Sequence, residues 1–334
     1  MSRVRLTLQQ VHALAYDCLR HNGCDEANAS AAARCISDAE RDGCHSHGLF
    51  RLPWYASALV SGRVNGKARP GLTRLAPSVL RIDGDNGFAP LAQQLGHGPL
   101  LECARDNGIA VLAVINMFHV AAMWPEVERL AMDGVCALAV TASYPYVAPA
   151  GGTRPLYGTN PMGFAWPRAD GPPLVFDQAS SAMARGEIEI AAREGHTIAS
   201  NVGLGPDGEP STDPAVVLQG AQLGFGGYKG ASLALMVELL AGPLIGEFLS
   251  FEACADDAGH GAPPKGGELI IALDPARFGD PQGNLAHAER LFEALLAQPG
   301  TRLPGARRLA NRSRTPREGV EIPLSLHREI LAYL

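Results

Sequence analysis

The sequence predicts an α/β protein that begins with a helical segment. Helical periodicity dominates residues 1–70, whereas from residue 68 onward short apolar runs alternate with helical patterns. This alternation places the rest of the chain in the α/β class. With 334 residues, 46% of them hydrophobic and 19% charged, the chain can form roughly two domains with substantial cores.

The first helix is expected from about residue 8 to His21. Thr7 and Gln10 have the spacing of a capping box at its start, and Gly23 ends it. A second, alanine-rich helix is expected over 25–41. A third is expected over 48–60, because a proline near the first turn is tolerated.

Strand patterns follow this helical segment. The helix after the strand at 109–115 begins at either His119 or Pro125, and its free N–H groups can face a phosphate. Residues 84–88 are expected to form a turn and residues 256–267 a loop. Strands are expected at 80–83, 109–115, 135–141, 163–166, 174–177 and 269–274, and helices at 91–107, after Asp177, from Lys229 and at 285–296.

Three segments have the composition of phosphate sites. Residues 203–208 have GxGxxG spacing, but no strand precedes them and no helix follows, which argues against a dinucleotide fingerprint. The glycine-rich turn before Lys229 suits either a phosphate site or the start of a buried helix. Residues 302–314 carry five arginines, which suit either a solvated basic face or a phosphate pocket.

A cluster of polar side chains lies in the segment RDGCHSHGLFR at residues 41–51. An arginine presents a planar fork of donors to a carboxylate, and a histidine titrates near neutral pH. The segment therefore suggests a carboxylate clamp, Arg51, beside an acid/base group formed by Ser46 and His47. The alternative is a helix end whose polar groups are satisfied by water.

The bulk properties exclude several classes of partner. A net charge of −6 gives no reason to expect nucleic acid or an anionic membrane. Seven cysteines without a CxxC pair are interpreted as reduced core thiols. No signal peptide or apolar run of bilayer length is present in the sequence, so we expect a cytoplasmic protein.

Five strings of the sequence carry a resemblance to a known family. In this order and at these separations they resemble the malate/L-lactate dehydrogenase-like family of NAD(P)-dependent oxidoreductases, over about residues 5–310. The form HVAAMWPEVE is similar to the Δ1-piperideine-2-carboxylate/Δ1-pyrroline-2-carboxylate reductases of that family. The strings are SHGLFRLPWY, NMFHVAAMWPEVE, YGTNPMGFAWPR, VFDQASSAMARGEIEIAAREG and FGGYKG.

The resemblance implies a fold that is not a Rossmann fold. It implies an NAD(P)-binding α/β domain with a largely antiparallel sheet, like that of L-sulfolactate dehydrogenase, flanked by a helical domain, in a homodimer. Residues 1–70 would be the helical segment with the catalytic Ser, His and Arg, and 71–300 the NAD(P)-binding domain. Residues 301–334 would return to the cofactor site and the helical domain.

The resemblance also implies site residues, motif by motif. Ser46 and His47 match the catalytic pair, Arg51 the substrate-carboxylate residue and Thr159 a substrate contact. Where relatives have HGD, this chain has Arg185, Gly186 and Glu187. Glu187 would keep the carboxylate that orients the imidazole, and Arg185 and Gly186 would lie in the substrate site. The implied cofactor contacts are His119, Val120, Ala121, Ala122, Met123, Asp177, Gln178, Ala179, Tyr228, Lys229, Arg302, Leu303, Pro304, Gly305, Ala306, Arg307 and Arg308.

The implied activity is reduction of a cyclic imino acid by hydride transfer to C2, with NADPH or alternatively NADH as cofactor. The expected products are L-pipecolate and L-proline. Reduction of a 2-keto acid, as in the malate, lactate, sulfolactate or ureidoglycolate branches, is the rival. A hydrolase with zinc on His45, His47 and His119 lacks a ligand at characteristic spacing, so no metal is expected. A ligand-binding module without catalysis is the remaining alternative.

Overall fold

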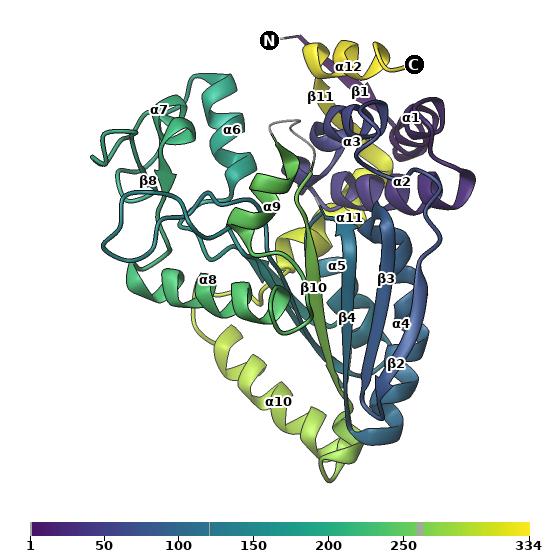
Figure 1. The fold of residues 1–334 in the computed structure, drawn as a ribbon. Coiled ribbons are helices and arrows are strands. Elements are labelled where there is room, and N and C mark those ends of the chain that lie inside the picture. The colour runs from purple at the N-terminus through teal and green to yellow at the C-terminus, as the bar shows by residue number, and fades with distance from the viewer. Residues whose placement is uncertain (1, 120, 259–262) are drawn as a thin grey trace.

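A computed structural model describes residues 2–119, 121–258 and 263–334 of the chain (Figure 1). Its centre is a seven-stranded sheet with the order β2-β3-β4-β10-β5-β6-β7. Strands β3 and β4 are parallel, and the other neighbours in this sheet pair antiparallel. The expected largely antiparallel sheet is therefore confirmed. The strands are β2 (Gly71–Ala76), β3 (Val79–Phe88), β4 (Ile109–Phe118), β5 (Cys136–Thr141), β6 (Met162–Trp166), β7 (Leu174–Gln178) and β10 (Lys265–Leu273).

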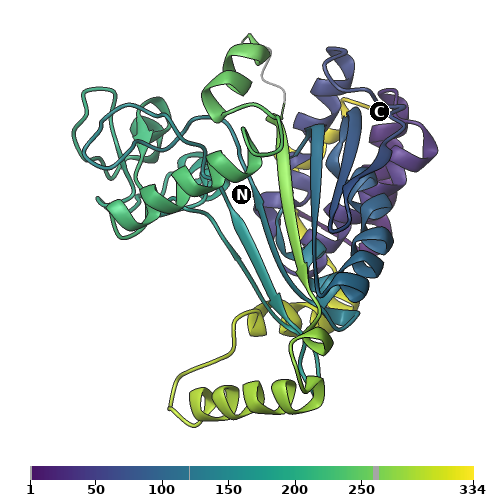
Figure 2. The ribbon, with the colours of Figure 1, turned by 60° about the horizontal axis from the view of Figure 1, so that its bottom comes forward.

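Helices cover both faces of this sheet (Figure 2). On one face α4 (Ala89–Asn107) and α5 (Trp124–Met132) enclose a core with Leu112 at its centre. On the other face α8 (Tyr228–Ala241) packs Val237 and Ala241 onto the sheet. The apolar runs of β4, β5 and β10 read as buried strands because both of their faces are covered.

The helical segment is built from both ends of the chain (Figure 1). Helices α1 (Leu8–His21), α2 (Glu26–Arg41) and α3 (Leu52–Val60) share one core with β11 (Val320–Pro323) and α12 (Leu324–Leu331). Strand β1 (Arg3–Leu6) pairs antiparallel with β11. The capping box of Thr7 and Gln10 is confirmed, whereas the sequence did not predict β1, β11 or α12.

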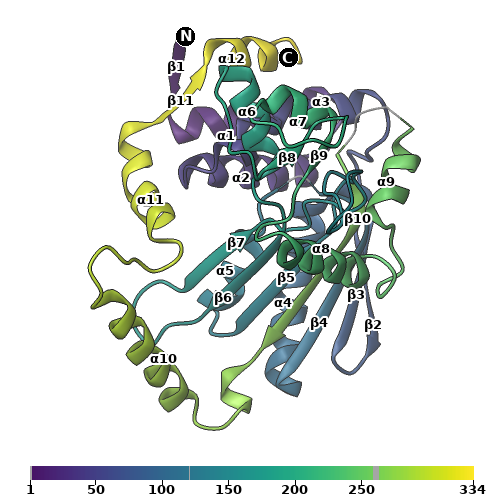
Figure 3. The same ribbon diagram turned by 90° about the vertical axis from the view of Figure 1, so that its left-hand side faces the viewer.

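The remaining elements extend from the sheet. Figure 3 shows α10 leading away from the far end of the sheet and α11 returning toward the helical segment. A small apolar cluster joins α6 to α7. These elements are α6 (Arg185–Glu194), β8 (Gly203–Leu204), α7 (Pro214–Gln219), β9 (Ala221–Gln222), α9 (Ser250–Asp257), α10 (Pro281–Leu296) and α11 (Ala306–Glu318).

Several expected boundaries were wrong. The expected turn at 84–88 lies inside β3, where Asp85 and Asn86 have positive φ and the register with β4 shifts. Leu49–Arg51 form a short 3-10 helix, so the third α-helix begins at Leu52. Of the two starts expected for the helix after β4, Pro125 agrees to within one residue with the observed start at Trp124, whereas His119 does not. In the expected loop at 256–267, β10 begins at Lys265, and 259–262 lie outside the described residues.

All seven cysteines are free, as expected. Cys18, Cys24, Cys103 and Cys136 are buried, but Cys254 on α9 is exposed, so it is not a core thiol. No helix in the described part of the chain is long and apolar enough to cross a membrane. The division of the chain at residues 70 and 300 stays a prediction.

An ion-pair network joins α11 to the helical segment and to α5. Arg312 donates to the buried Asp42 carboxylate at 2.5 Å and to Glu128 Oε2 at 2.9 Å. Its guanidinium also lies 5.4 Å from the centre of the Trp124 ring. Three separate elements therefore meet at Arg312. It is one of the five arginines at residues 302–314, which were expected to face solvent or to bind phosphate.

We predict that Arg312→Met destabilises the fold by roughly 2 kcal/mol, because Asp42 and Glu128 then lose a charged partner in a buried site. Arg314 makes an exposed pair with Glu318 on the same helix. Arg314→Met is the matched control and should change stability by less than about 0.5 kcal/mol. Urea titrations measure both free energies of unfolding; equal effects would contradict a structural role for Arg312.

Candidate active site

A cavity of about 730 Å³ lies where the helical segment, α6 and the ends of β5 and β7 meet. Its walls bring together most of the residues predicted for the site. They include Ser46, His47, Arg51, His119, Ala121, Ala122, Met123, Thr159, Asp177, Gln178, Ala179, Arg185, Gly186, Glu187 and Arg307. Val120 lies outside the described residues.

Arg51 contributes a buried cation to the wall of the cavity. Its side chain is buried, and its Nε donates to the Ser46 carbonyl at 2.9 Å. The guanidinium lies 5.3 Å from the ring centres of both Phe50 and Trp54. Nη1 is 3.2 Å from the Glu189 carboxylate. These contacts fix the planar fork at the wall of the cavity.

Glycine at position 186 allows Arg51 to lie against α6. A Cβ atom there would be 2.6 Å from Nη2 of Arg51 and 3.2 Å from Cβ of Ser46. Gly186 therefore acts through its lack of a side chain. Arg185 stacks on the ring of Tyr146, 4.3 Å from its centre, and lies 3.6 Å from Glu189.

His47 and Ser46 form the predicted polar pair, with Ser46 Oγ and His47 Nδ1 3.2 Å apart. Desolvation in the cavity wall, with the neighbouring Arg51 charge second, lowers the pKa of His47 to about 3. The imidazole is therefore neutral at pH 7. Glu187 lines the cavity from the first turn of α6, but among the described residues it makes no hydrogen bond to His47.

His45 has a different partner from His47. Its Nδ1 lies 2.6 Å from the buried Glu40 carboxylate, and this hydrogen bond raises the pKa of His45. The other oxygen of Glu40 accepts the Leu49 N–H at 2.8 Å. Glu40 therefore holds the 45–49 turn in place.

The opposite wall is formed by the turn between β4 and α5 and by the end of β7. Gly163 on β6 lets this turn lie close to the sheet, since a Cβ there would be 2.7 Å from the Met123 carbonyl. The Met123 N–H donates to Asp177 Oδ2 at 3.2 Å, and Arg308 lies 3.1 Å from Oδ1. Burial is the largest influence on Asp177 and raises its pKa.

The arginines of the segment 302–308 differ in their surroundings. Arg307 lines the cavity, whereas Arg308 is held by Asp177 and lies 5.0 Å from the Trp124 ring centre. Arg302 is exposed. The other residues of the expected cofactor segment 302–308 do not line the cavity; they are Arg302, Leu303, Pro304, Gly305, Ala306 and Arg308.

Tyr228 and Lys229 are also absent from the cavity wall. They begin α8, follow a turn in which Gly226 and Gly227 have positive φ, and are exposed. The inner face of α8 packs on the sheet. Gly230, which follows Lys229, nevertheless lies against Ser180, which follows Ala179, since a Cβ on Gly230 would be 2.4 Å from the Ser180 carbonyl.

Thr159 is fixed by a buried network behind the cavity. Its N–H donates to Ser143 Oγ at 3.0 Å, and the two hydroxyl oxygens lie 3.2 Å apart. The next residue, Asn160, donates to Glu238 Oε1 at 2.7 Å. Thr159 thus has a fixed position and presents its side chain to the cavity.

Several polar residues of this wall were not predicted from the sequence, among them Glu189, Tyr146 and Ser143. Glu189 lies four residues after Arg185 on α6, which is the spacing of a helical ion pair and was the available signal. Tyr146 and Ser143 reach the cavity from the Pro/Gly-rich passage after β5. No local pattern predicts where such a passage folds.

Residues 6–331 match the sequence model of a family described as malate/L-lactate dehydrogenase. The chain belongs to this family. A Δ1-pyrroline-2-carboxylate/Δ1-piperideine-2-carboxylate reductase of Pseudomonas aeruginosa is 49% identical over 333 residues, which cover 99% of each chain. This is a family of oxidoreductases, as the motifs of the sequence indicated.

Solved structures support the fold assignment. The Δ1-piperideine-2-carboxylate reductase of Pseudomonas syringae pvar. tomato superposes with a TM-score of 0.93 at 38% identity, and the match covers 99% of this chain and 100% of that one.

Another relative by sequence is a (2R)-3-sulfolactate dehydrogenase (NADP(+)) of Chromohalobacter salexigens, which is 41% identical over 100% of this chain and 98% of its own. The family therefore includes enzymes that act on different substrates.

The zinc hydrolase alternative used His45, His47 and His119. Within the described residues, the group whose donor atoms lie close enough to share a metal is instead His119, Glu126 and Glu268. His45 has the Glu40 carboxylate as its partner. The geometry thus does not support that triad of histidines.

Proposed function

We propose that the protein reduces cyclic imino acids with NADPH, converting Δ1-piperideine-2-carboxylate to L-pipecolate and Δ1-pyrroline-2-carboxylate to L-proline. The observation that carries this proposal is that Arg51 faces the same cavity as residues 121–123 and 177–179. A group able to hold a carboxylate and the segments expected to hold a nicotinamide thus share one space. The names of the relatives support the choice of substrate.

The cavity has features that suit a dinucleotide. Its volume of about 730 Å³ lies within the range of cofactor sites. The amino end of α5 offers a partial positive charge, and Arg307 adds a full one at the rim. A reduced nicotinamide, when bound, would supply the hydride. We propose NADPH in preference to NADH because Arg307 can pair with a 2′-phosphate.

Arg51 would bind the substrate carboxylate and Thr159 would fix its orientation. Arg51 already has one carboxylate, Glu189, at Nη1. A substrate carboxylate therefore would bind the remaining donors of the fork or compete with Glu189. Positioning of this kind lowers the entropy cost of reaching the reactive geometry.

His47 would act as a neutral imidazole. With a pKa of about 3, it is a neutral imidazole at neutral pH and has no imidazolium proton to give. It can, however, accept a proton at one ring nitrogen while it donates from the other, and Ser46 lies within hydrogen-bonding distance. We therefore assign Ser46 and His47 to proton movement at the imine nitrogen, with Glu187 as a further member reached from α6.

The rival activity is reduction of a 2-keto acid to a 2-hydroxy acid. The sulfolactate dehydrogenase relative favours it, and a guanidinium clamp suits either class of acid. A second alternative is a module that binds ligands without catalysis, and turnover of any substrate would exclude it. One set of assays distinguishes both alternatives from the proposed activity.

We expect the purified protein to oxidise NADPH faster with Δ1-piperideine-2-carboxylate or Δ1-pyrroline-2-carboxylate than with pyruvate, oxaloacetate or sulfopyruvate, because the site would discriminate by transition-state binding. The same assays with NADH give the cofactor preference. A higher kcat/KM for a 2-keto acid would replace the proposed activity by its rival.

We predict that Arg51→Met raises KM for the imino acid by about tenfold or more, since a charged hydrogen bond is lost. Gly186→Ala should raise KM in the same direction by a smaller factor, because the new Cβ displaces the guanidinium. Initial rates at varied substrate concentration give KM and kcat for each variant.

A matched control for Gly186→Ala is Ala192→Ser, which makes a similarly small change on α6 beyond the residues that line the cavity. It should leave KM unchanged. An unchanged KM in Arg51→Met would remove Arg51 from the substrate site. Affinity for NADPH, measured by fluorescence titration, should survive both substitutions at residues 51 and 186.

We also propose that the protein is a homodimer. The outer face of α8 exposes Leu235, Met236 and Leu239, and Leu244 just beyond it is 64% exposed. A row of exposed apolar side chains of this kind is typical of an interface. Light scattering should give twice the chain mass, and Leu239→Arg should lower it, whereas a monomeric wild-type protein would contradict the proposal.

A further inference from the structure

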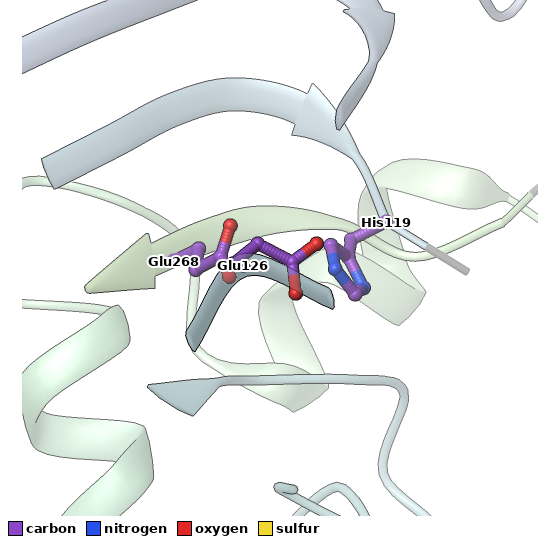
Figure 4. A group of neighbouring side chains, drawn as sticks. All are labelled: His119, Glu126 and Glu268. Atoms are coloured by element: carbon purple, nitrogen blue, oxygen red, sulfur yellow. The ribbon is translucent and has the colours of Figure 1, made fainter. Parts of the chain in front are cut away.

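Three polar side chains, His119, Glu126 and Glu268, lie next to one another (Figure 4), and His119 also lines the cavity. His119 follows β4, Glu126 lies in the first turn of α5, and Glu268 lies on β10. One donor atom of each side chain lies within 4.8 Å of the others. In Figure 4, Glu126 lies between the other two side chains.

These side chains are enclosed and incompletely satisfied. His119 is 7% exposed and Glu268 0% exposed. His119 Nε2, Glu126 Oε2 and Glu268 Oε1 are buried atoms with no hydrogen-bond partner. Neither carboxylate makes an ion pair with a lysine or arginine of the described chain. Buried polar atoms without partners are rare in proteins, and buried charges are normally paired or bound to a metal.

We propose that His119, Glu126 and Glu268 bind one divalent transition-metal cation of the zinc class. An imidazole nitrogen and two carboxylates form a donor set that suits zinc, and two negative charges balance the cation. A cation at this point would satisfy all three unpaired atoms at once. Zinc ligands lie about 2.0–2.2 Å from the metal, so only small side-chain movements would bring these donors into range.

The surroundings of the group have the features of a built site. Gln93 of α4 donates to Glu268 Oε2 at 2.8 Å and thereby orients this carboxylate. The register of β10 against β4 shifts between Gly266 and Glu268, which directs the Glu268 side chain. A small cavity of about 60 Å³ lies on one side and has Gln93 and Glu126 in its wall.

The cation would have a structural effect on the active site. It would join the end of β4, the start of α5 and β10, and so fix His119 at the wall of the large cavity. The sequence predicted no metal, and it did not single out these three residues, which lie on separate elements with no characteristic spacing. This inference does not depend on the substrate of the enzyme.

The proposal is tested by binding of zinc and cobalt to the full-length protein after removal of metals with a chelator. We expect one equivalent of Zn²⁺ per chain by calorimetry and by elemental analysis after gel filtration. Cobalt should give visible absorption without the charge-transfer band of thiolate ligation, since the site has no sulfur. The melting temperature should rise with Zn²⁺ concentration, because the cation binds the folded state.

Glu268→Gln should weaken Zn²⁺ binding by at least a hundredfold and remove the rise in melting temperature. Gln93→Leu keeps all three ligands and should weaken binding by about 10–100-fold, as loss of an outer partner does. Gln93→Leu therefore tests the site even if Glu268→Gln does not fold. Glu289→Gln, which alters a distant pair with Arg168, is the matched control and should bind Zn²⁺ as the wild type does.

Three results would overturn the proposal. The first is absence of stoichiometric binding in the wild type. The second is a thiolate band with cobalt, which would place the metal on one or more of the cysteines. The third is wild-type affinity in both Glu268→Gln and Gln93→Leu.

Discussion

The arrangement of the candidate site depends on the burial of one guanidinium. Arg51 must keep its charge, because a guanidinium is not deprotonated in proteins, and it is enclosed between the helical segment and α6. A buried charge requires partners, and the chain supplies the Ser46 carbonyl, the Glu189 carboxylate and two aromatic rings. These partners come from two parts of the chain that are more than a hundred residues apart. The contact therefore fixes how α6 faces the 45–51 turn.

The electrostatics of the cavity follow from this placement. The charge of Arg51, added to desolvation, keeps His47 neutral. The opposite wall is organised by another buried acid, Asp177, which holds the Met123 N–H and Arg308. Each wall thus has a carboxylate that holds donors in place. Glu189 holds Arg51 on one wall, and Asp177 holds Arg308 and a backbone N–H on the other. Glu40 does the same for the 45–49 turn.

Local signals in the sequence were sufficient for elements whose cause is local. The capping box of Thr7 predicted the start of α1, and continuous apolar runs predicted β4 and β5 because both faces of those strands are covered. Motif resemblance predicted the family, and most of the site residues that it implied do line the cavity. The roles of the individual site residues stay proposals.

Contacts between distant segments were not predictable in this way. The arginine run was expected to face solvent or phosphate, but Arg308 and Arg312 pair with acids from β7, α2 and α5. Likewise, nothing near Glu268 in the sequence indicates that it meets Glu126 and His119. Such pairings depend on register and packing across the whole fold, which single-sequence patterns do not contain.

The pairing of β1 with β11 has a consequence for the order of folding. Residues 3–6 have their partners at 320–323, and the core of α1–α3 includes side chains from β11 and α12. During synthesis, the first helices emerge long before these partners exist. The central sheet, whose strands lie between residues 71 and 273, can pair earlier. The helical layer can thus be completed only when the last residues have been made, although its first helices are made at the start, and until then part of its apolar surface has no native partner.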